Sequence, residues 1–122
     1  MKSFFLSLIL LLSLSFAVKA QNWAGAISSN WNDPNNWIPA VVPISTSNVN
    51  ITNTGNSPKL QSNVTIGVIN VHPGVVLDFN GYSMTVLSNI GGYVTFNGAT
   101  LINTNGASDI VLNITTGTSG YY

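Results

Sequence analysis

Three tryptophans are the side chains of this sequence best suited to contact a ligand. Trp23, Trp31 and Trp37 fall within one short stretch that is rich in Asn and Pro, and the chain has no other Trp. An exposed indole ring can stack on the apolar face of a sugar, and neighbouring Asn amides can bond to its hydroxyl groups. The alternative is structural, since each aromatic ring buries about 150–250 Å² when it covers a core. We favour the structural interpretation and keep carbohydrate stacking as the competing hypothesis.

The titratable side chains are too few and too scattered to predict a catalytic or metal site. His72 is the only histidine, and the chain has no cysteine. Because a zinc site needs three or four converging ligands, we expect His72 to be structural or exposed. Asp33, Asp78 and Asp109 could in principle supply a carboxylate pair or bind calcium. Asp33 precedes a proline and is expected to form a turn, and Asp78 is expected at a water-facing strand position. We therefore expect no enzyme activity, no metal and no cofactor.

The N-terminus has the three-part pattern of a signal peptide. The start is positively charged, residues 4–14 are almost wholly apolar, and Val18 and Ala20 occupy the two positions that a signal peptidase reads. The apolar run is shorter than the ~20 residues that a membrane-spanning helix needs. The sequence thus predicts a signal peptide over residues 1–20 and a mature chain from Gln21 without a membrane span. That chain would be secreted or held at the cell surface.

The mature chain carries little charge. Without Lys2 and Lys19 it keeps one Lys and three Asp, so its net charge is 1 − 3 = −2 with His72 neutral, and it has no Arg and no Glu. A nucleic-acid binder needs clustered Lys and Arg to neutralise phosphates, so we exclude nucleic acid as a partner. The polar surface must come from Asn, Ser and Thr, including the 17 Asn of the chain. This composition fits an extracellular wall or matrix protein.

The chain from residue 49 to residue 114 contains a series of short apolar–polar–apolar units. Their polar centres are Asn50, Thr65, Asn70, Asp78, Thr85, Thr95 and Asn113. Alternation over so few residues predicts short strands, each with one face buried and the other in water. No window of the mature chain shows apolar residues at helical spacing, and β-branched residues and glycines are dense. The sequence therefore predicts an all-β fold.

Two all-β architectures are built from units of this size. In a β-solenoid, three strands form a coil of ~20–30 residues, and each strand stacks on its counterpart one coil later. In a β-sandwich, neighbouring strands pair antiparallel through tight turns. Asn-Gly pairs such as Asn80-Gly81 would suit hairpins, but hairpin strands are usually longer than three residues. The shortness of the strands favours the solenoid, and the sandwich remains the alternative.

The chain also resembles a class of secreted bacterial surface proteins. Trp31 to Trp37 fits the pattern W-x-x-P-x-N-W, and Val42-Pro43 and Val49-Asn50-Ile51 follow it. In that class such an opening precedes right-handed parallel β-helix or autotransporter-like repeats, to which residues 74–86 are similar. The class usually has a glycine pair before the Val-Pro pair, which this chain lacks. The resemblance covers about residues 30–114, and it implies a right-handed parallel β-solenoid (β-helix) in an adhesin-like surface protein.

These patterns divide the chain into four parts. Residues 1–20 are the signal peptide, residues 21–48 a Trp/Asn/Pro-rich N-terminal cap, residues 49–114 the solenoid coils, and residues 115–122 a Gly/Thr/Ser tail. Solenoid ends expose unpaired backbone, and natural ones are capped. Because nothing bulky is available to cap the C-terminal end, we expect either a fragment of a longer protein or self-association through that end.

Two functions remain open at this point. The first is a non-enzymatic structural or adhesive surface segment, whose uncharged Asn, Thr and Ser faces present hydrogen-bonding groups to a polymer or to another protein. The second is the N-terminal portion of a carbohydrate-binding or polysaccharide-degrading β-helix protein, in which the Trp segment contacts the polysaccharide. The expected partners are accordingly an extracellular polysaccharide or another surface protein.

Overall fold

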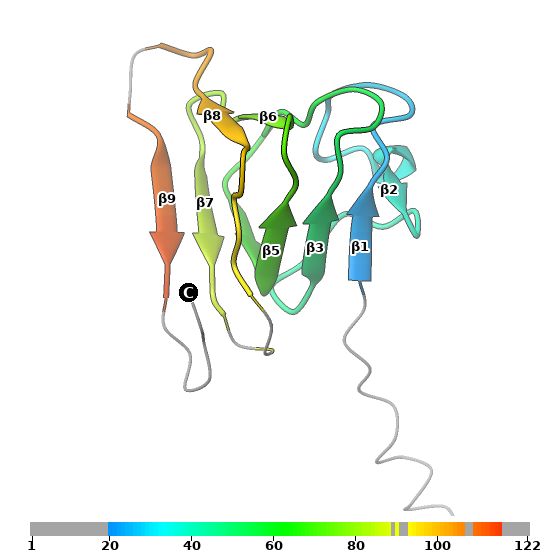
Figure 1. Cartoon of the computed structure of the whole chain (residues 1–122), viewed down its shortest axis with the longest axis horizontal. Helices are drawn as coiled ribbons and strands as arrows, with labels where there is room; N and C mark the ends of the chain where they lie inside the picture. Colours follow the sequence, from blue (N-terminus) through cyan, green and yellow to red (C-terminus); the bar gives the residue numbers. More distant parts are fainter. Residues whose placement is uncertain (1–19, 89, 91–92, 107–108, 116–122) are drawn as a thin grey trace, which may run out of the picture.

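The computed structural model describes residues 20–88, 90, 93–106 and 109–115. The described residues form short strands and one 3-10 turn (Figure 1): β1 (Ala20–Trp23), η1 (Pro34–Asn36), β2 (Trp37–Ile38), β3 (Asn48–Ile51), β4 (Val64–Ile66), β5 (Val68–Val71), β6 (Val76–Asp78), β7 (Ser83–Val86), β8 (Thr100–Ile102) and β9 (Val111–Ile114). All of the predicted signal peptide before Ala20, and the predicted tail after residue 115, lie outside these residues. Among the described residues, no helix is long and apolar enough to cross a membrane.

The strands form three narrow sheets in which almost all neighbours are parallel. Sheet A has the order β2-β1-β3-β5, sheet B consists of β6 and β8, and sheet C has the order β4-β7-β9. Among the described strands, only β1 and β2 pair antiparallel, and the other strand pairs are parallel. Consecutive strands along the chain, such as β4, β5 and β6, belong to three different sheets, and β3 and β5 lie side by side in Figure 1. This arrangement confirms the β-solenoid and excludes the sandwich, whose neighbours pair antiparallel.

Residues one coil apart are in register across sheet A. Asn22 lies opposite Asn50, Asn50 lies opposite Asn70, and a bridge joins Asn70 to Thr95. The chain thus passes through sheet A about four times. Successive members of this row are 28, 20 and 25 positions apart, which agrees with the expected coil length.

One core fills the space between the three sheets. The buried apolar residues of the coils that form this core are Val49, Ile51, Leu60, Ile66, Ile69, Val71, Val75, Leu77, Phe79, Met84 and Val86. Because successive side chains of a strand point to opposite faces, the apolar members of each unit turn inward and the polar centre turns outward. Each fully buried side chain contributes about 1.5–3 kcal/mol. Burial decreases toward the last coil, where Phe96, Leu101 and Leu112 are only partly buried.

The Asn80-Gly81 pair forms a corner of the solenoid. Its φ angles are 50° and 80°, which Gly and Asn tolerate better than other residues. The N–H of Tyr82 donates to the carbonyl of Phe79 at 2.8 Å and closes a tight turn between β6 and β7. These two strands belong to different sheets. The Asn-Gly dipeptide, which would suit a hairpin, therefore connects strands of two different sheets here.

The Trp/Asn/Pro-rich segment of residues 21–48, for which the sequence analysis predicted no strand, contains β2 and most of β1. β1 pairs with β3, and β2 pairs with β1, so the ladder of sheet A already begins within residues 20–48. The alternation of β1 is hidden because one of its inward residues is Gln21 rather than an apolar residue. The amide nitrogen of Gln21, in the orientation that its surroundings require, donates to the carbonyls of Pro39 at 3.1 Å and Val41 at 3.2 Å. These bonds satisfy a buried polar group that would otherwise be costly.

Candidate functional site

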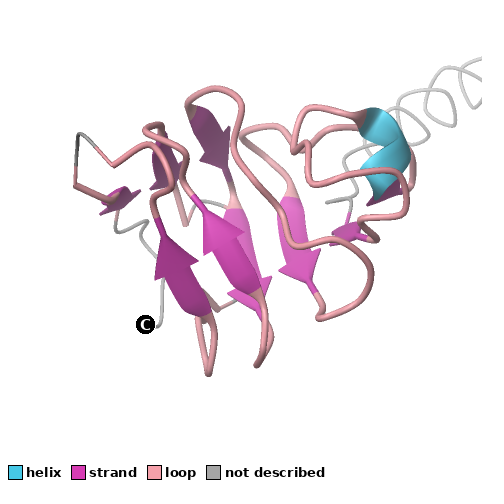
Figure 2. Ribbon diagram, turned by 90° about the horizontal axis from the view of Figure 1, so that it is seen from above, coloured by secondary structure: helices cyan, strands magenta, loops and turns pink. Residues whose placement is uncertain are grey.

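The three tryptophans form one buried cluster beside β1 and β2. Trp23, Trp31 and Trp37 are 1, 0 and 2 % exposed. Trp37 lies edge-on to Trp23 and Trp31, with ring centroids 5.0 and 4.8 Å apart, and the other two rings stack at 6.4 Å. Figure 2 places η1, which leads into β2, at one end of the solenoid. No ring offers an open face to a sugar, so the burial supports the structural interpretation and argues against carbohydrate stacking on these rings.

Polar side chains of the same segment hold its loops closed. Asp33 caps η1, and its Oδ1 accepts a hydrogen bond from the N–H of Asn35 at 2.9 Å. This confirms its expected role in a turn. The buried Asn36 amide oxygen accepts from the N–H groups of Ile27 at 2.9 Å and Ser28 at 3.0 Å. Both side chains accept hydrogen bonds from backbone N–H groups. Their role is therefore structural rather than ligand-binding.

Asp78 is buried and does not face water. Its carboxylate accepts from the hydroxyl of Thr104 at 2.6 Å, from the N–H of Thr104 at 3.0 Å and from the N–H of Asn80 at 2.9 Å. Lys59 Nζ lies 3.9 Å away. Burial by itself raises the pKa of Asp78, but the bonds from Thr104 and Asn80 and the Lys59 charge outweigh it, and the pKa is held below its usual value. The predicted water-facing position was wrong because Thr104 covers the carboxylate from the next coil.

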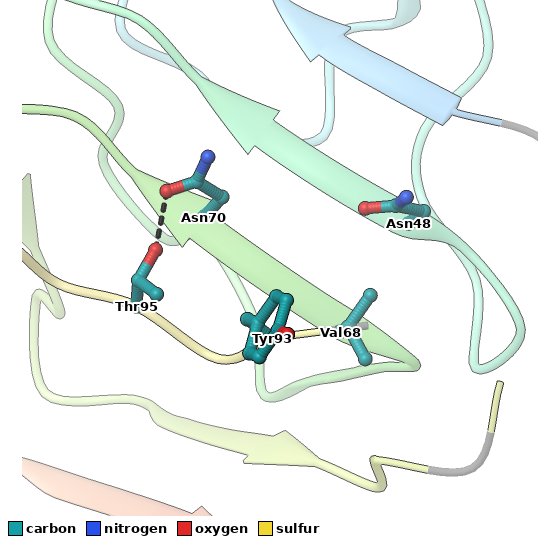
Figure 3. Close-up of a pocket in the computed structure, with 5 residues that line it drawn as sticks. All are labelled: Asn48, Val68, Asn70, Tyr93 and Thr95. Atoms are coloured by element: carbon teal, nitrogen blue, oxygen red, sulfur yellow. Dashed lines mark hydrogen bonds between the residues drawn. The ribbon is translucent and has the colours of Figure 1, made fainter. Parts of the chain in front are cut away.

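The outer face of sheet A carries a row of amide side chains. Asn22, Asn50 and Asn70 are direct neighbours across three strands, and we call them the amide row. Nδ2 of Asn50 donates to Oδ1 of Asn22 at 3.2 Å. The hydroxyl of Thr95 donates to Oδ1 of Asn70, as the dashed line in Figure 3 shows. His72 follows β5, and its Nε2 lies 2.8 Å from Oδ1 of Asn50 and 3.4 Å from Nδ2 of Asn70. His72 is therefore part of a hydrogen-bonded surface.

The directions of these hydrogen bonds leave the Nδ2 group of Asn70 unused as a donor. Oδ1 of Asn50 can only accept, so the 2.8 Å contact requires a proton on Nε2 of His72. A protonated Nε2 cannot accept from Asn70, and the 3.4 Å contact is then not a hydrogen bond. Nδ2 of Asn70 has no other acceptor within the described part of the chain. The amide row consequently presents an N–H donor of Asn70 to the surroundings.

A shallow hollow lies beside the amide row. It is lined by Asn48, Val68, Asn70, Tyr93 and Thr95 (Figure 3) and has a volume of about 380 Å³; we call it the amide groove. Val68 is 2 % exposed and forms the floor, whereas Tyr93 is 68 % exposed. The pairing of Asn70 with Thr95 places Tyr93, two residues earlier on the same face, beside Val68. The groove thus combines one aromatic ring with amide and hydroxyl groups.

The described residues show neither a metal site nor a carboxylate pair. Across residues 20–115, apart from the few not described, no three His, Cys, Asp or Glu side chains lie close enough to hold a metal ion. The described partners of the Asp78 carboxylate are Thr104, Asn80 and Lys59, and those partners include no second acid. Asp33 caps η1, and Asp109 is an exposed residue that precedes β9 in the chain.

Sequence reasoning did not single out the amide groove. Asn48 and Tyr93 are 45 positions apart, and they meet only because β3, β5 and the segment around Thr95 stack in register. The sequence pattern did predict that Asn70 and Thr95 face outward. It could not predict which exposed aromatic residue lies next to them.

Comparisons with known proteins identify a family. The model of a family described as a domain of unknown function, DUF8693, matches residues 22–119. No curated protein and no solved structure shows a significant match. The matched region runs from within β1 to beyond β9, so it contains the amide row and the amide groove.

Proposed function

Because the chain belongs to the DUF8693 family, whose description gives no role, we propose a function from the geometry of the solenoid. The protein is a secreted, non-enzymatic structural or adhesive module of the cell surface or the extracellular matrix. The observation that carries this proposal is the amide row on the outer face of sheet A. It offers hydrogen-bonding groups without charge, on a rigid sheet.

The spacing of the amide row suits contact with an extended partner. Asn22, Asn50 and Asn70 repeat at the distance between neighbouring strands, which is about 4.8 Å. The bond from Asn50 to Asn22, the contact of His72 with Asn50 and the bond from Thr95 to Asn70 fix the orientation of the amides before any partner arrives. A preorganised surface loses less conformational entropy on binding. Such a face supports adhesion to a polymer or to another surface protein.

The contacts of the titratable side chains support a non-enzymatic role. A general acid or base must reach the proton that it transfers in the substrate. The Asp78 carboxylate is bonded to Thr104 and Asn80, Asp33 caps η1, and Nε2 of His72 donates to Asn50. Each of these groups has a structural partner inside the fold.

The position of the predicted cleavage site is compatible with the fold. The bond after Ala20 lies at the first residue of β1. Cleavage there removes one exposed residue and its pairing with Asn48, while Gln21 to Trp23 remain paired with β3. Processing and folding therefore do not compete for the buried part of the strand.

Export is tested by fusing the chain to a reporter that is active only outside the cytoplasm. We expect an active reporter and an N-terminus at Gln21 in the purified mature protein. A full-length product that stays in the cytoplasm would contradict the proposal.

Adhesion is tested by retention of the purified protein on intact cells. The double variant Asn22→Ala/Asn50→Ala removes two members of the amide row, and we expect it to be retained several-fold less. The matched control is Thr65→Ala/Thr85→Ala, which removes two in-register polar residues from the outer face of sheet C. Equal retention of the two variants would contradict an adhesive role for the amide row, provided that melting curves show both to be folded.

A further inference from the structure

We infer that the amide groove binds a neutral hexose unit of a polysaccharide. Tyr93 stacks on the apolar face of the sugar ring, and the amides of Asn48 and Asn70 bond to its hydroxyl groups. This inference rests on the proposed adhesive function and narrows it to one ligand class at one place. In this inference the residue that stacks on the sugar is the exposed Tyr93, and not one of the three buried tryptophans.

Tyr93 has the exposure that the tryptophans lack. Its side chain is 68 % exposed, and it stands on the outer face of sheet A beside the buried Val68. An aromatic ring held on a sheet presents a flat apolar surface that few groups other than the C–H face of a pyranose match at a wet, polar site. The hydroxyl of Tyr93 adds a polar end to the same ring.

The polar groups around the ring suit the hydroxyls of a sugar. Nδ2 of Asn70 is left without an acceptor by the hydrogen bond between His72 and Asn50. The Asn48 side chain is exposed and has no hydrogen-bond partner among the residues described. The Thr95 hydroxyl donates to Oδ1 of Asn70, and its oxygen can still accept a hydrogen bond. A sugar hydroxyl is both donor and acceptor, so it can use all three groups.

The charge and size of the groove restrict the ligand further. None of its described lining residues is charged, so among them an anionic sugar or a phosphate would find no counter-charge. Its volume of about 380 Å³ lies at the lower end of the range for ligand sites, which suits one ring rather than a whole oligosaccharide. Asn70 belongs both to the groove and to the amide row, so further units of a polymer can lie along that row. A peptide that adds to a sheet uses an open strand edge, whereas this groove lies on a sheet face.

The test follows the side-chain amide signals of the purified protein by ¹⁵N NMR during titration with neutral oligosaccharides. The probes are cellohexaose, maltohexaose and mannohexaose. We expect at least one of them to shift the signals of Asn48 and Asn70. Tyr93→Ala should weaken that binding by about tenfold or more, and Tyr93→Phe should keep it. The matched control is Tyr82→Ala, which removes a ring that is 38 % exposed at the corner between β6 and β7 and should leave the affinity unchanged.

Asn48→Ala gives a second variant that does not depend on the aromatic ring. The amide has no hydrogen-bond partner in the described part of the chain, so its removal should weaken binding without changing the melting temperature. The inference is overturned if none of the three oligosaccharides shifts these signals, or if Tyr93→Ala binds as well as the wild type. A protein that is exported and retained on cells but binds no sugar overturns this inference alone. A protein that binds the sugar but is not exported overturns only the proposed function.

Discussion

Replacing the buried tryptophans by phenylalanine should separate the contribution of their indole hydrogen bonds from that of their packing. Trp31 and Trp37 are both buried in one cluster, so Trp31→Phe and Trp37→Phe remove the same ring atoms from similar surroundings. The two indole N–H groups differ in their partners. Nε1 of Trp37 donates to the carbonyl of Trp31 at 2.8 Å. Nε1 of Trp31 has no hydrogen-bond partner in the described part of the chain.

The expected difference follows from these partners. Trp37→Phe leaves the buried carbonyl of Trp31 without its donor, which costs roughly 1–3 kcal/mol beyond the loss of packing. Trp31→Phe removes a donor that is already unpaired and carries no such cost. The packing losses largely cancel in the comparison. We therefore expect Trp37→Phe to be less stable by about 2 kcal/mol, or roughly 8–16 °C in melting temperature for a domain of this size.

A third variant adds an internal check. Nε1 of Trp23 donates to the carbonyl of Asn56 at 2.7 Å. Asn56 is exposed, so water can replace the lost donor in Trp23→Phe. Thermal unfolding followed by far-UV circular dichroism should rank Trp31→Phe as the most stable variant, Trp23→Phe as intermediate and Trp37→Phe as the least stable. Equal melting temperatures for Trp31→Phe and Trp37→Phe, or the reverse order, would refute the reasoning.

Three further perturbations have outcomes set by the structure. The pKa of Asp78 is lowered in the folded state, so its contribution to stability is present above its unfolded pKa of about 3.9 and is lost as the pH falls through the folded value. The urea midpoint of the wild type should drop on acidification below about pH 4, and Asp78→Asn should show a flatter pH profile with a lower midpoint at neutral pH; parallel profiles would contradict the assignment. Gly81→Ala should cost about 1–2 kcal/mol or more in urea unfolding, because φ is 80° and the added carbon would lie 2.8 Å from Nδ2 of Asn105. The control Gly106→Ala, where no atom lies within 4 Å of the added carbon, should change stability by less than about 0.5 kcal/mol, and similar losses in both would show that neither φ nor the contact with Asn105 is the cause. Ala20→Phe should block cleavage of the leader, because a bulky residue occupies a position that the peptidase reads, while the exposed site at the start of β1 tolerates the ring; the mass of the product and its melting curve decide this, and normal cleavage would count against the predicted site.

Strand positions within the coils could be predicted because alternation is a local property. The units around Thr65 and Thr85 correspond to β4 and β7, and the Asn80-Gly81 pair lies at a corner as the solenoid requires. The sequence analysis did not predict β1 or β2, for two different reasons. β1 turns the polar Gln21 inward, and β2 has only two residues, so neither shows a pattern of its own.

The environment of individual side chains was harder to predict than the strands. Asp78 occupies the polar centre of its unit, yet Thr104 from the next coil covers it. The burial of the tryptophans agrees with the favoured structural interpretation, but their mutual orientation depends on how η1 and β2 fold back on β1. Such contacts join residues that are far apart in the chain, so no local sequence pattern predicts them.

The sequence alone determined that this protein is all-β, built from short alternating units with an uncharged polar exterior. Alternation of side chains is enough for this, because the pleat of a strand sends successive residues to opposite faces. Only the tertiary structure decided which units stack on one another. The register that pairs Asn50 with Asn70 and Asn70 with Thr95 brings Asn48 and Tyr93 to one groove. That register depends on how loops of unequal length between the strands close, and such closure is a property of the whole coil rather than of any single unit.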